Sequence, residues 1–147
     1  MLTEYMDPSL VTFIEAESRD EVLKKLVHLI YQAGKIKDKE EFFNAILKRE
    51  KIVSTGIGMG VAIPHAKLPA FDLFFIAIAI LKKPLPWHSL DGSPVRIVFM
   101  IGGPDDKQTE YLQLLSRLTQ TIKNEEIRKK LLNLSETNNV IELFETI

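Results

Sequence analysis

The chain has 147 residues, of which 46% are hydrophobic and 27% are charged, as in an ordinary globular protein. Its formal net charge of −1 provides no basic field for nucleic acid and no polybasic patch for a membrane surface. The absence of cysteine excludes disulfides, thiol catalysis and cysteine-ligated metals. We expect a single domain over residues 1–147, cytoplasmic, with no signal peptide and no membrane insertion.

Two amphipathic helices are predicted in the first third of the chain. Ser18, with an acid three residues later, has the spacing of a capping box and opens a helix that runs to about Gly34. Asp38 repeats this spacing at the start of a second helix, which ends near Arg49–Glu50. The chain therefore begins with helical structure.

Apolar runs in the middle of the chain predict buried strands. These are Val61–Ile63, stopped by Pro64, then Leu73–Leu81 and Val95–Ile101. A loop is expected over 84–92, followed by helices at about 106–123, 125–134 and 136–146. Helices on both sides of central strands indicate the α/β class with a mixed sheet.

A glycine-rich segment connects the second helix to the first predicted strand. It contains Ser54, Thr55, Gly56, Gly58 and Gly60. A P-loop would need a lysine after its last glycine, and a dinucleotide fingerprint would follow a strand rather than a helix. The exposed N–H groups and the two hydroxyls can cradle an anion, and the same composition also fits a plain connector.

Arg49 falls on the apolar stripe of the second predicted helix. One interpretation is that its head extends past the core into solvent. The other is that the guanidinium points into a pocket, where it would bind a phosphate group as a fork.

His65 combines a rigid support with reactive chemistry. It follows Pro64, which fixes its own φ, so the side chain should leave a strand end and remain open to solvent. A neutral imidazole is nucleophilic and forms a labile phosphoramidate, so His65 is predicted to carry a phosphoryl group transiently. Arg49 and the glycine-rich segment would supply the stabilising charge and donors. No two histidines have chelate spacing, so neither a metal nor another cofactor is expected.

Three segments together resemble the enzyme IIA domain of the bacterial phosphotransferase system, fructose/mannitol class, which includes the nitrogen-regulatory branch. They are Arg49–Glu50, Ser54–Gly58 and Gly60–His65, with supporting similarity at 91–99. The resemblance implies a mixed β-sheet sandwiched between helices. It also implies that His65 accepts a phosphoryl group from HPr or a nitrogen-branch homologue, with Arg49 steadying the phosphate. The group would then pass to an enzyme IIB domain, or its presence would regulate partner proteins.

Tyr111 departs from the pattern of that family, whose members commonly carry a second histidine at this place. A phenol donates one hydrogen bond but is not cationic at pH 7. Tyr111 also belongs to an apolar stripe with Leu115, Leu118 and Ile122, so it is either a core tyrosine or a pocket hydroxyl.

Two functions remain open from the sequence. One is the phosphocarrier, and the other is a binding module of the same fold that controls partners by contact. A free-standing domain leans towards the nitrogen branch, although separate sugar-specific IIA proteins also exist.

Overall fold

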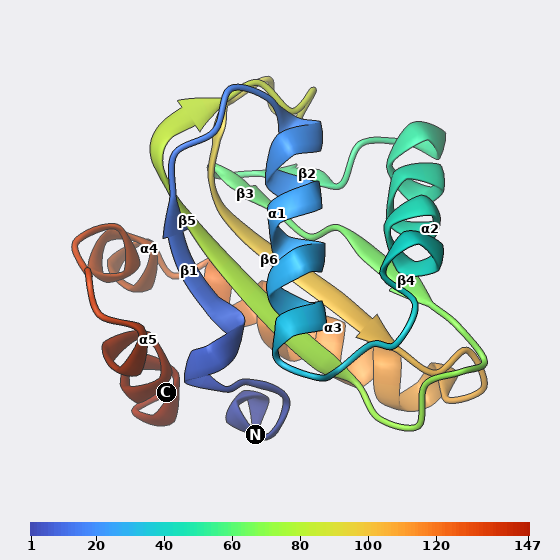
Figure 1. Ribbon diagram of the computed structural model, residues 1–147. Coiled ribbons are helices and arrows are strands. Elements are labelled where there is room, and N and C mark those ends of the chain that lie inside the picture. Colours follow the sequence, from blue (N-terminus) through green and yellow to red (C-terminus); the bar gives the residue numbers. More distant parts are fainter.

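The computed structural model describes all 147 residues (Figure 1). Its helices are α1 (Arg19–Gln32), α2 (Lys39–Ile52), α3 (Gln108–Ile122), α4 (Glu125–Leu132) and α5 (Thr137–Glu145), preceded by short 3₁₀ helices η1 (Leu2–Tyr5) and η2 (Pro8–Leu10). Its strands are β1 (Val11–Ile14), β2 (Gly56–Gly58), β3 (Val61–Ala62), β4 (His65–Lys67), β5 (Phe75–Leu85) and β6 (Val95–Gly103).

The six strands form one mixed sheet in the order β1-β5-β6-β3-β2, with β4 also paired to β6. The two long central strands, β5 and β6, are antiparallel. In contrast, β1 runs parallel to β5, and both β3 and β4 run parallel to β6. The prediction of a mixed sheet is confirmed.

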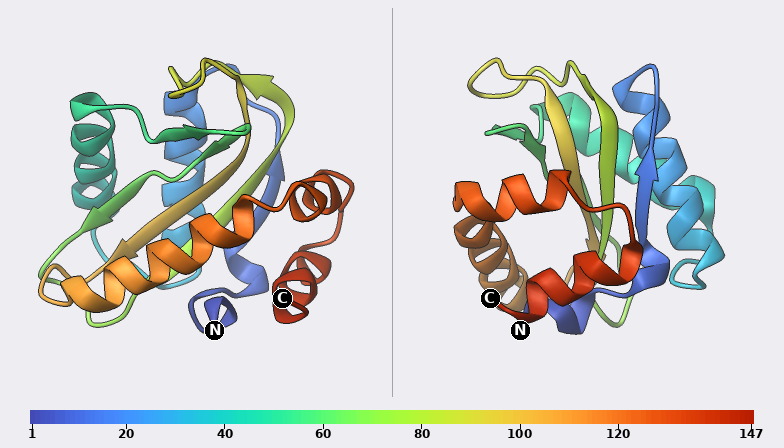
Figure 2. Two further views of the ribbon diagram at one scale, coloured as in Figure 1. Left: turned by 180° about the vertical axis from the view of Figure 1, so that it is seen from behind. Right: turned by 90° about the vertical axis from the view of Figure 1, so that its left-hand side faces the viewer.

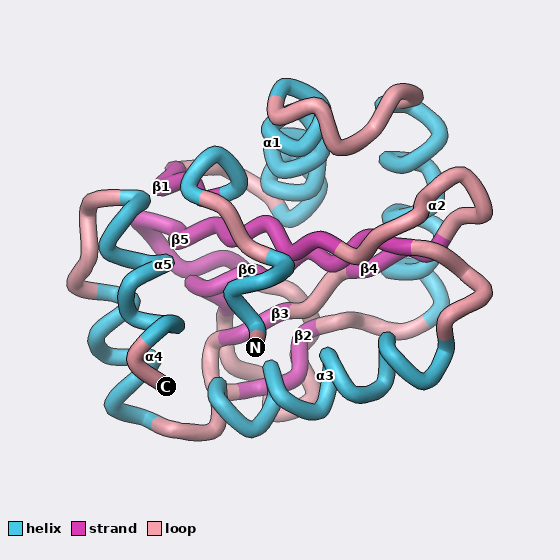
Figure 3. Tube along the Cα trace, turned by 90° about the horizontal axis from the view of Figure 1, so that it is seen from below, coloured by secondary structure: helices cyan, strands magenta, loops and turns pink.

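Helices cover both faces of this sheet. The α1 and α2 helices lie on one face, and α3, α4 and α5 lie on the other (Figures 2 and 3). Strand β5 shows why, because its alternate residues enter two separate hydrophobic clusters. Ala77 and Ala79 face the α1 side, whereas Ile76 and Ile78 face the α3 side, and all four are buried. A sheet that is apolar on both faces requires cover on both, so the helical sandwich is confirmed.

The starts of the first two helices follow the predicted capping. The Ser18 side chain accepts from the backbone N–H of Glu21, and that of Asp38 accepts from the N–H of Glu41. The Glu21 carboxylate, however, accepts from the N–H of Glu17 rather than from that of the cap residue. None of the helices combines the length and apolar character needed to cross a membrane.

The structure corrects several predicted boundaries. Strand β5 continues to Leu85 rather than ending at Leu81, because a register shift lets Leu85 pair with Val95. Strand β1 was not predicted, since its four residues give too short a pattern to identify. On α3 the buried stripe contains Leu114, whereas Leu115 is only half-buried.

Candidate functional site

His65 lies at the free edge of the sheet, between two helices. It is the first residue of β4, and that strand pairs only with β6. Helix α2 packs against β4, and the start of α3 reaches it through Gln108, whose side-chain oxygen accepts from Lys67 Nζ at 2.7 Å. The prediction that His65 follows a strand end is wrong in detail. Pro64 lacks an N–H, but its carbonyl accepts from the N–H of Ile101, so the chain returns to β6 as a new strand.

The imidazole of His65 is held by one hydrogen bond. Its Nδ1 lies 2.9 Å from the carbonyl oxygen of Ile63. A carbonyl oxygen only accepts, so in the neutral ring Nδ1 carries the hydrogen and Nε2 keeps its lone pair. Burial lowers the pKa of His65 below its ordinary value, and the charges of Arg49 and Lys67 lower it further. The site therefore favours a neutral, nucleophilic imidazole.

Arg49 lies in the last turn of α2 and is half-buried. Its Nη1 donates to the carbonyl of Val53 at 2.7 Å. A positive charge is favourable at this carboxyl-terminal end of the helix. The same positive charge lowers the pKa of His65 and counters the rise in the pKa of Tyr111. The positive charge of Arg49 therefore acts on both rings, while one of its donors is used at the end of its own helix.

The surroundings of Tyr111 are compatible with both interpretations from the sequence, a core tyrosine and a pocket hydroxyl. Its ring is only 6% exposed and stacks on Phe74, so it belongs to the core. Its other neighbour is His65, with ring centroids 5.8 Å apart. Burial raises the pKa of Tyr111, and no hydrogen bond within the chain contributes to that shift. The hydroxyl is therefore neutral, and its donor is not used by another group of the chain.

The hydroxyls expected to line an anion cradle are occupied within the chain. Ser54 donates to the carbonyl of Trp87 at 2.5 Å, and Thr55 donates to Glu50 Oε1 at 2.6 Å. Gly56 and Gly58 lie in a hairpin packed on a neighbouring loop, since an added Cβ would fall 2.4 Å from Ser89 Oγ or 2.9 Å from Asp91 Oδ2. These four residues therefore stabilise the loop. Arg49, His65 and Tyr111 are the side chains that interact with one another, and we call them the cluster.

Two residues of this region were missed by the sequence analysis. Lys67 shares a strand face with His65, and its Nζ lies 4.3 Å from the ring centroid of Tyr111. Glu50 is buried, and both of its carboxylate oxygens accept from Thr55. Residues two apart on a strand lie on the same face, so a strand predicted to begin at His65 would have identified Lys67. The sequence analysis did not predict that strand.

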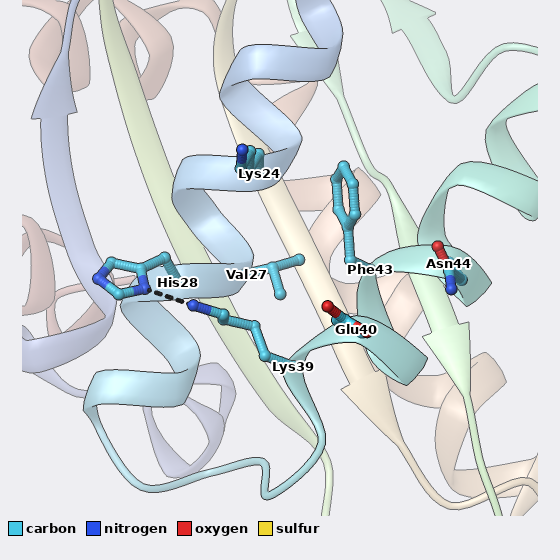
Figure 4. A pocket seen from close by; sticks show the side chains of 7 residues that line it. All are labelled: Lys24, Val27, His28, Lys39, Glu40, Phe43 and Asn44. Carbon is cyan, nitrogen blue, oxygen red and sulfur yellow. Dashed lines mark hydrogen bonds between the residues drawn. The ribbon is translucent and has the colours of Figure 1, made fainter.

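The best-defined clefts of the molecule lie away from this cluster. A cleft of about 520 Å³ lies between α1 and α2, and Lys24, His28, Lys39 and Glu40 are among its lining residues (Figure 4). Neither His65 nor Arg49 lines it, nor do they line the four other well-defined cavities of the molecule. No group of three or more histidine and acidic side chains is arranged to hold a metal ion. In the cluster itself, His65 and Arg49 are half-buried and Tyr111 is buried.

Two curated relatives share most of this chain. The fructose-specific EIIABC component of the phosphotransferase system from Bacillus subtilis is 38% identical over 130 residues, which are 88% of this chain. The chain spans only 20% of that relative's length. The nitrogen regulatory protein of Bradyrhizobium diazoefficiens is 32% identical over 133 residues, covering 88% of this chain and 85% of that protein.

Solved structures agree with these relatives. The nitrogen regulatory protein IIA-Ntr from Neisseria meningitidis superposes with a TM-score of 0.91 at 26% identity, covering 97% of both chains. Enzyme IIA for mannitol from Escherichia coli, solved in complex with phosphorylated enzyme IIB, shares the fold with a TM-score of 0.81 at 17% identity, covering 97% of this chain and 98% of that one. The family model described as "Phosphoenolpyruvate-dependent sugar phosphotransferase system, EIIA 2" matches residues 4–147, and the chain belongs to this family.

Proposed function

We propose that this protein is a phosphohistidine carrier in which His65 accepts a phosphoryl group at Nε2. The observation that carries the proposal is the hydrogen bond from Nδ1 to Ile63, which leaves Nε2 as the nucleophilic nitrogen. In the transfer, a bond forms between Nε2 and phosphorus while the P–N bond of the donor's phosphohistidine breaks. Its electron pair returns to the donor ring, and no proton has to leave Nε2 beforehand.

The surrounding charges suit the group in transit. The Arg49 guanidinium keeps donors beyond the one used on Val53, and these would neutralise the phosphoryl oxygens. The hydroxyl of Tyr111, whose ring lies next to the imidazole, would donate one further hydrogen bond. Together they would replace the cationic second histidine common in the family.

The partners follow from the family and from the exposed apolar side chains next to the site residues in the chain. We propose HPr, or its nitrogen-branch homologue, as donor, and an enzyme IIB domain or a regulated protein as acceptor. An enzyme IIA of this fold is known in complex with phosphorylated enzyme IIB, which supports the IIB assignment. Exposed apolar side chains flank the cluster, with Ile52 and Val53 after Arg49 and Leu112 after Tyr111, and would form the contact. We place the carrier, acting as one domain, in the cytoplasm.

The test is incubation of the protein with enzyme I, HPr and phosphoenolpyruvate. Wild-type protein should gain one acid-labile phosphate, and His65→Ala should gain none. His28→Ala is the matched control, because that histidine is exposed on α1 and should leave the yield unchanged. A wild type that takes no phosphate, or a His65→Ala variant that retains it, would contradict the proposal. A wild type that takes no phosphate would favour the alternative function, a binding module that controls its partners by contact.

A further inference from the structure

A continuous series of hydrogen bonds leads from α2 to the imidazole of His65. Glu50 accepts at both carboxylate oxygens from Thr55, once from its backbone N–H and once from its hydroxyl, each at 2.6 Å. The carbonyl of Thr55 accepts from the N–H of Ile63 at 3.0 Å. The carbonyl of Ile63 accepts in turn from Nδ1 of His65 at 2.9 Å. These hydrogen bonds connect the segment that follows α2 with the segment that enters β4.

The burial of Glu50 is exceptional in this molecule. Its side chain is 3% exposed, and no other charged residue of the protein is buried. A buried carboxylate is costly unless its oxygens accept hydrogen bonds, and Thr55 supplies both of these bonds. An apolar side chain would fill the same space without that cost, but it could not fix the backbone N–H and the hydroxyl of Thr55 together.

The far end of the series determines the direction of the Ile63 carbonyl. Pro64 fixes its own φ and restricts Ile63 to an extended conformation. With the N–H of Ile63 held by Thr55, little freedom remains for the carbonyl that accepts from His65. Hydrogen bonds to one ring nitrogen of a histidine determine its tautomer and orientation.

We propose that Glu50 is a positioning residue, which acts through Thr55 and Ile63 to hold His65 as the Nδ1–H tautomer with Nε2 available. Its consequence for transfer rests on the proposed phosphocarrier function. The tautomer itself is a property of the unphosphorylated protein, so it is measurable whether or not transfer occurs.

The primary measurement is the ¹⁵N NMR spectrum of the His65 ring, recorded above its pKa. Wild-type protein should show Nδ1 protonated and Nε2 unprotonated. Glu50→Ala and Thr55→Val, which remove acceptor or hydroxyl donor, should shift the ring towards the Nε2–H form. In Glu50→Gln the amide oxygen can accept from the N–H of Thr55 while the amide nitrogen donates to the Thr55 hydroxyl oxygen, and Thr55→Ser keeps the hydroxyl, so both variants should retain the wild-type spectrum.

The second measurement is the rate of phosphoryl gain from phosphorylated HPr. Glu50→Ala and Thr55→Val should lose about tenfold or more in rate, the usual effect of removing an orienting partner. The conservative pair should stay near wild type. Val140→Ala, a cavity variant in the core beneath α5, controls for lowered stability and should leave the His65 spectrum unchanged.

Each result decides the inference. If Glu50→Ala fails to fold, Thr55→Val tests the hydroxyl bond to Glu50 by itself, with a nearly isosteric side chain and the backbone N–H of residue 55 still in place. An Nδ1–H ring in both disruptive variants would overturn the positioning role. A shift in Glu50→Gln as large as in Glu50→Ala would also overturn it, because the charge rather than the hydrogen bonds would be responsible. A wild type that takes no phosphate but shows the expected tautomers would refute the carrier function and leave the positioning role supported.

Discussion

The rings of His65 and Tyr111 lie 5.8 Å apart, centroid to centroid, at an interplanar angle of 47°. The two residues come from different layers, one from the sheet edge at β4 and the other from α3. Lys67 lies over the tyrosine ring, with its Nζ 4.3 Å from the ring centroid. Tyr111 is therefore a phenol that lies beside the imidazole of His65 and has a cation over its ring.

Removing the Tyr111 hydroxyl should slow phosphoryl transfer. In Tyr111→Phe we expect a loss of about 10- to 100-fold in rate, the worth of one hydrogen bond to a charged group. Stability should change little, because the hydroxyl has no partner within the chain. Stopped-flow transfer assays and urea unfolding measure the two effects. An unchanged rate would assign Tyr111 to the core alone.

Introducing the second imidazole should have the opposite effect. Tyr111→His places a group that can be cationic beside His65, so transfer should be faster than in wild type. The same assay with donor concentration varied separates the rate of transfer from donor binding. If Tyr111→His is no faster, the tyrosine is an adequate replacement and does not limit the carrier.

The pH dependence of phosphorylation should follow the depressed pKa of His65. Burial, Arg49 and Lys67 all favour the neutral ring, so the nucleophile should persist below the ordinary histidine pKa and be lost only at lower pH. Lys67→Gln removes one of these charges, which should raise the pKa and move the acid limb of the profile upward. NMR titration of His65 checks both shifts. A pKa in Lys67→Gln at or below that of wild type would contradict the assignment.

Arg49 should contribute through its planar fork as well as its charge. Arg49→Gln should lower the rate about 10²- to 10³-fold, as for a preorganised donor at a developing charge. Arg49→Lys keeps the charge but loses bidentate geometry, so its rate should lie between the rates of wild type and Arg49→Gln. Both variants also lose or weaken the contact with Val53, which should cost at most about 1 kcal/mol in the free energy of unfolding. Equal rates in Arg49→Lys and Arg49→Gln would exclude a role for its charge.

The packing of the glycine-rich hairpin gives a test by stability. In Gly56→Ala the new Cβ would lie 2.4 Å from Ser89 Oγ and 3.0 Å from Ser89 Cα, so the loop must move. We expect a loss of about 1–3 kcal/mol in the free energy of unfolding, as for overpacking. Ser89→Ala should be nearly neutral, because that buried hydroxyl has no hydrogen-bond partner. Chemical denaturation of both variants provides the comparison, and an unaffected Gly56→Ala would contradict the close packing.

The sequence determined the class of the fold and both early helices, and it predicts His65 as the site residue. Capping side chains at Ser18 and Asp38 act over a few residues, so their effect is readable locally. The resemblance around Arg49 and His65 also lies within one continuous stretch. The family could therefore be predicted from the sequence, and the matching family model confirms it.

Tertiary structure decided which groups around His65 are free to act. Ser54 and Thr55 have suitable hydroxyls in the sequence, but their partners, Trp87 and Glu50, are set by how a loop and a helix end pack together. Tyr111 reaches His65 because β4 pairs with β6 beneath α3, a relation between segments distant in the chain. Periodicity and capping report short-range order, whereas hydrogen-bond partners and side-chain contacts depend on long-range packing, and only the folded chain determines those.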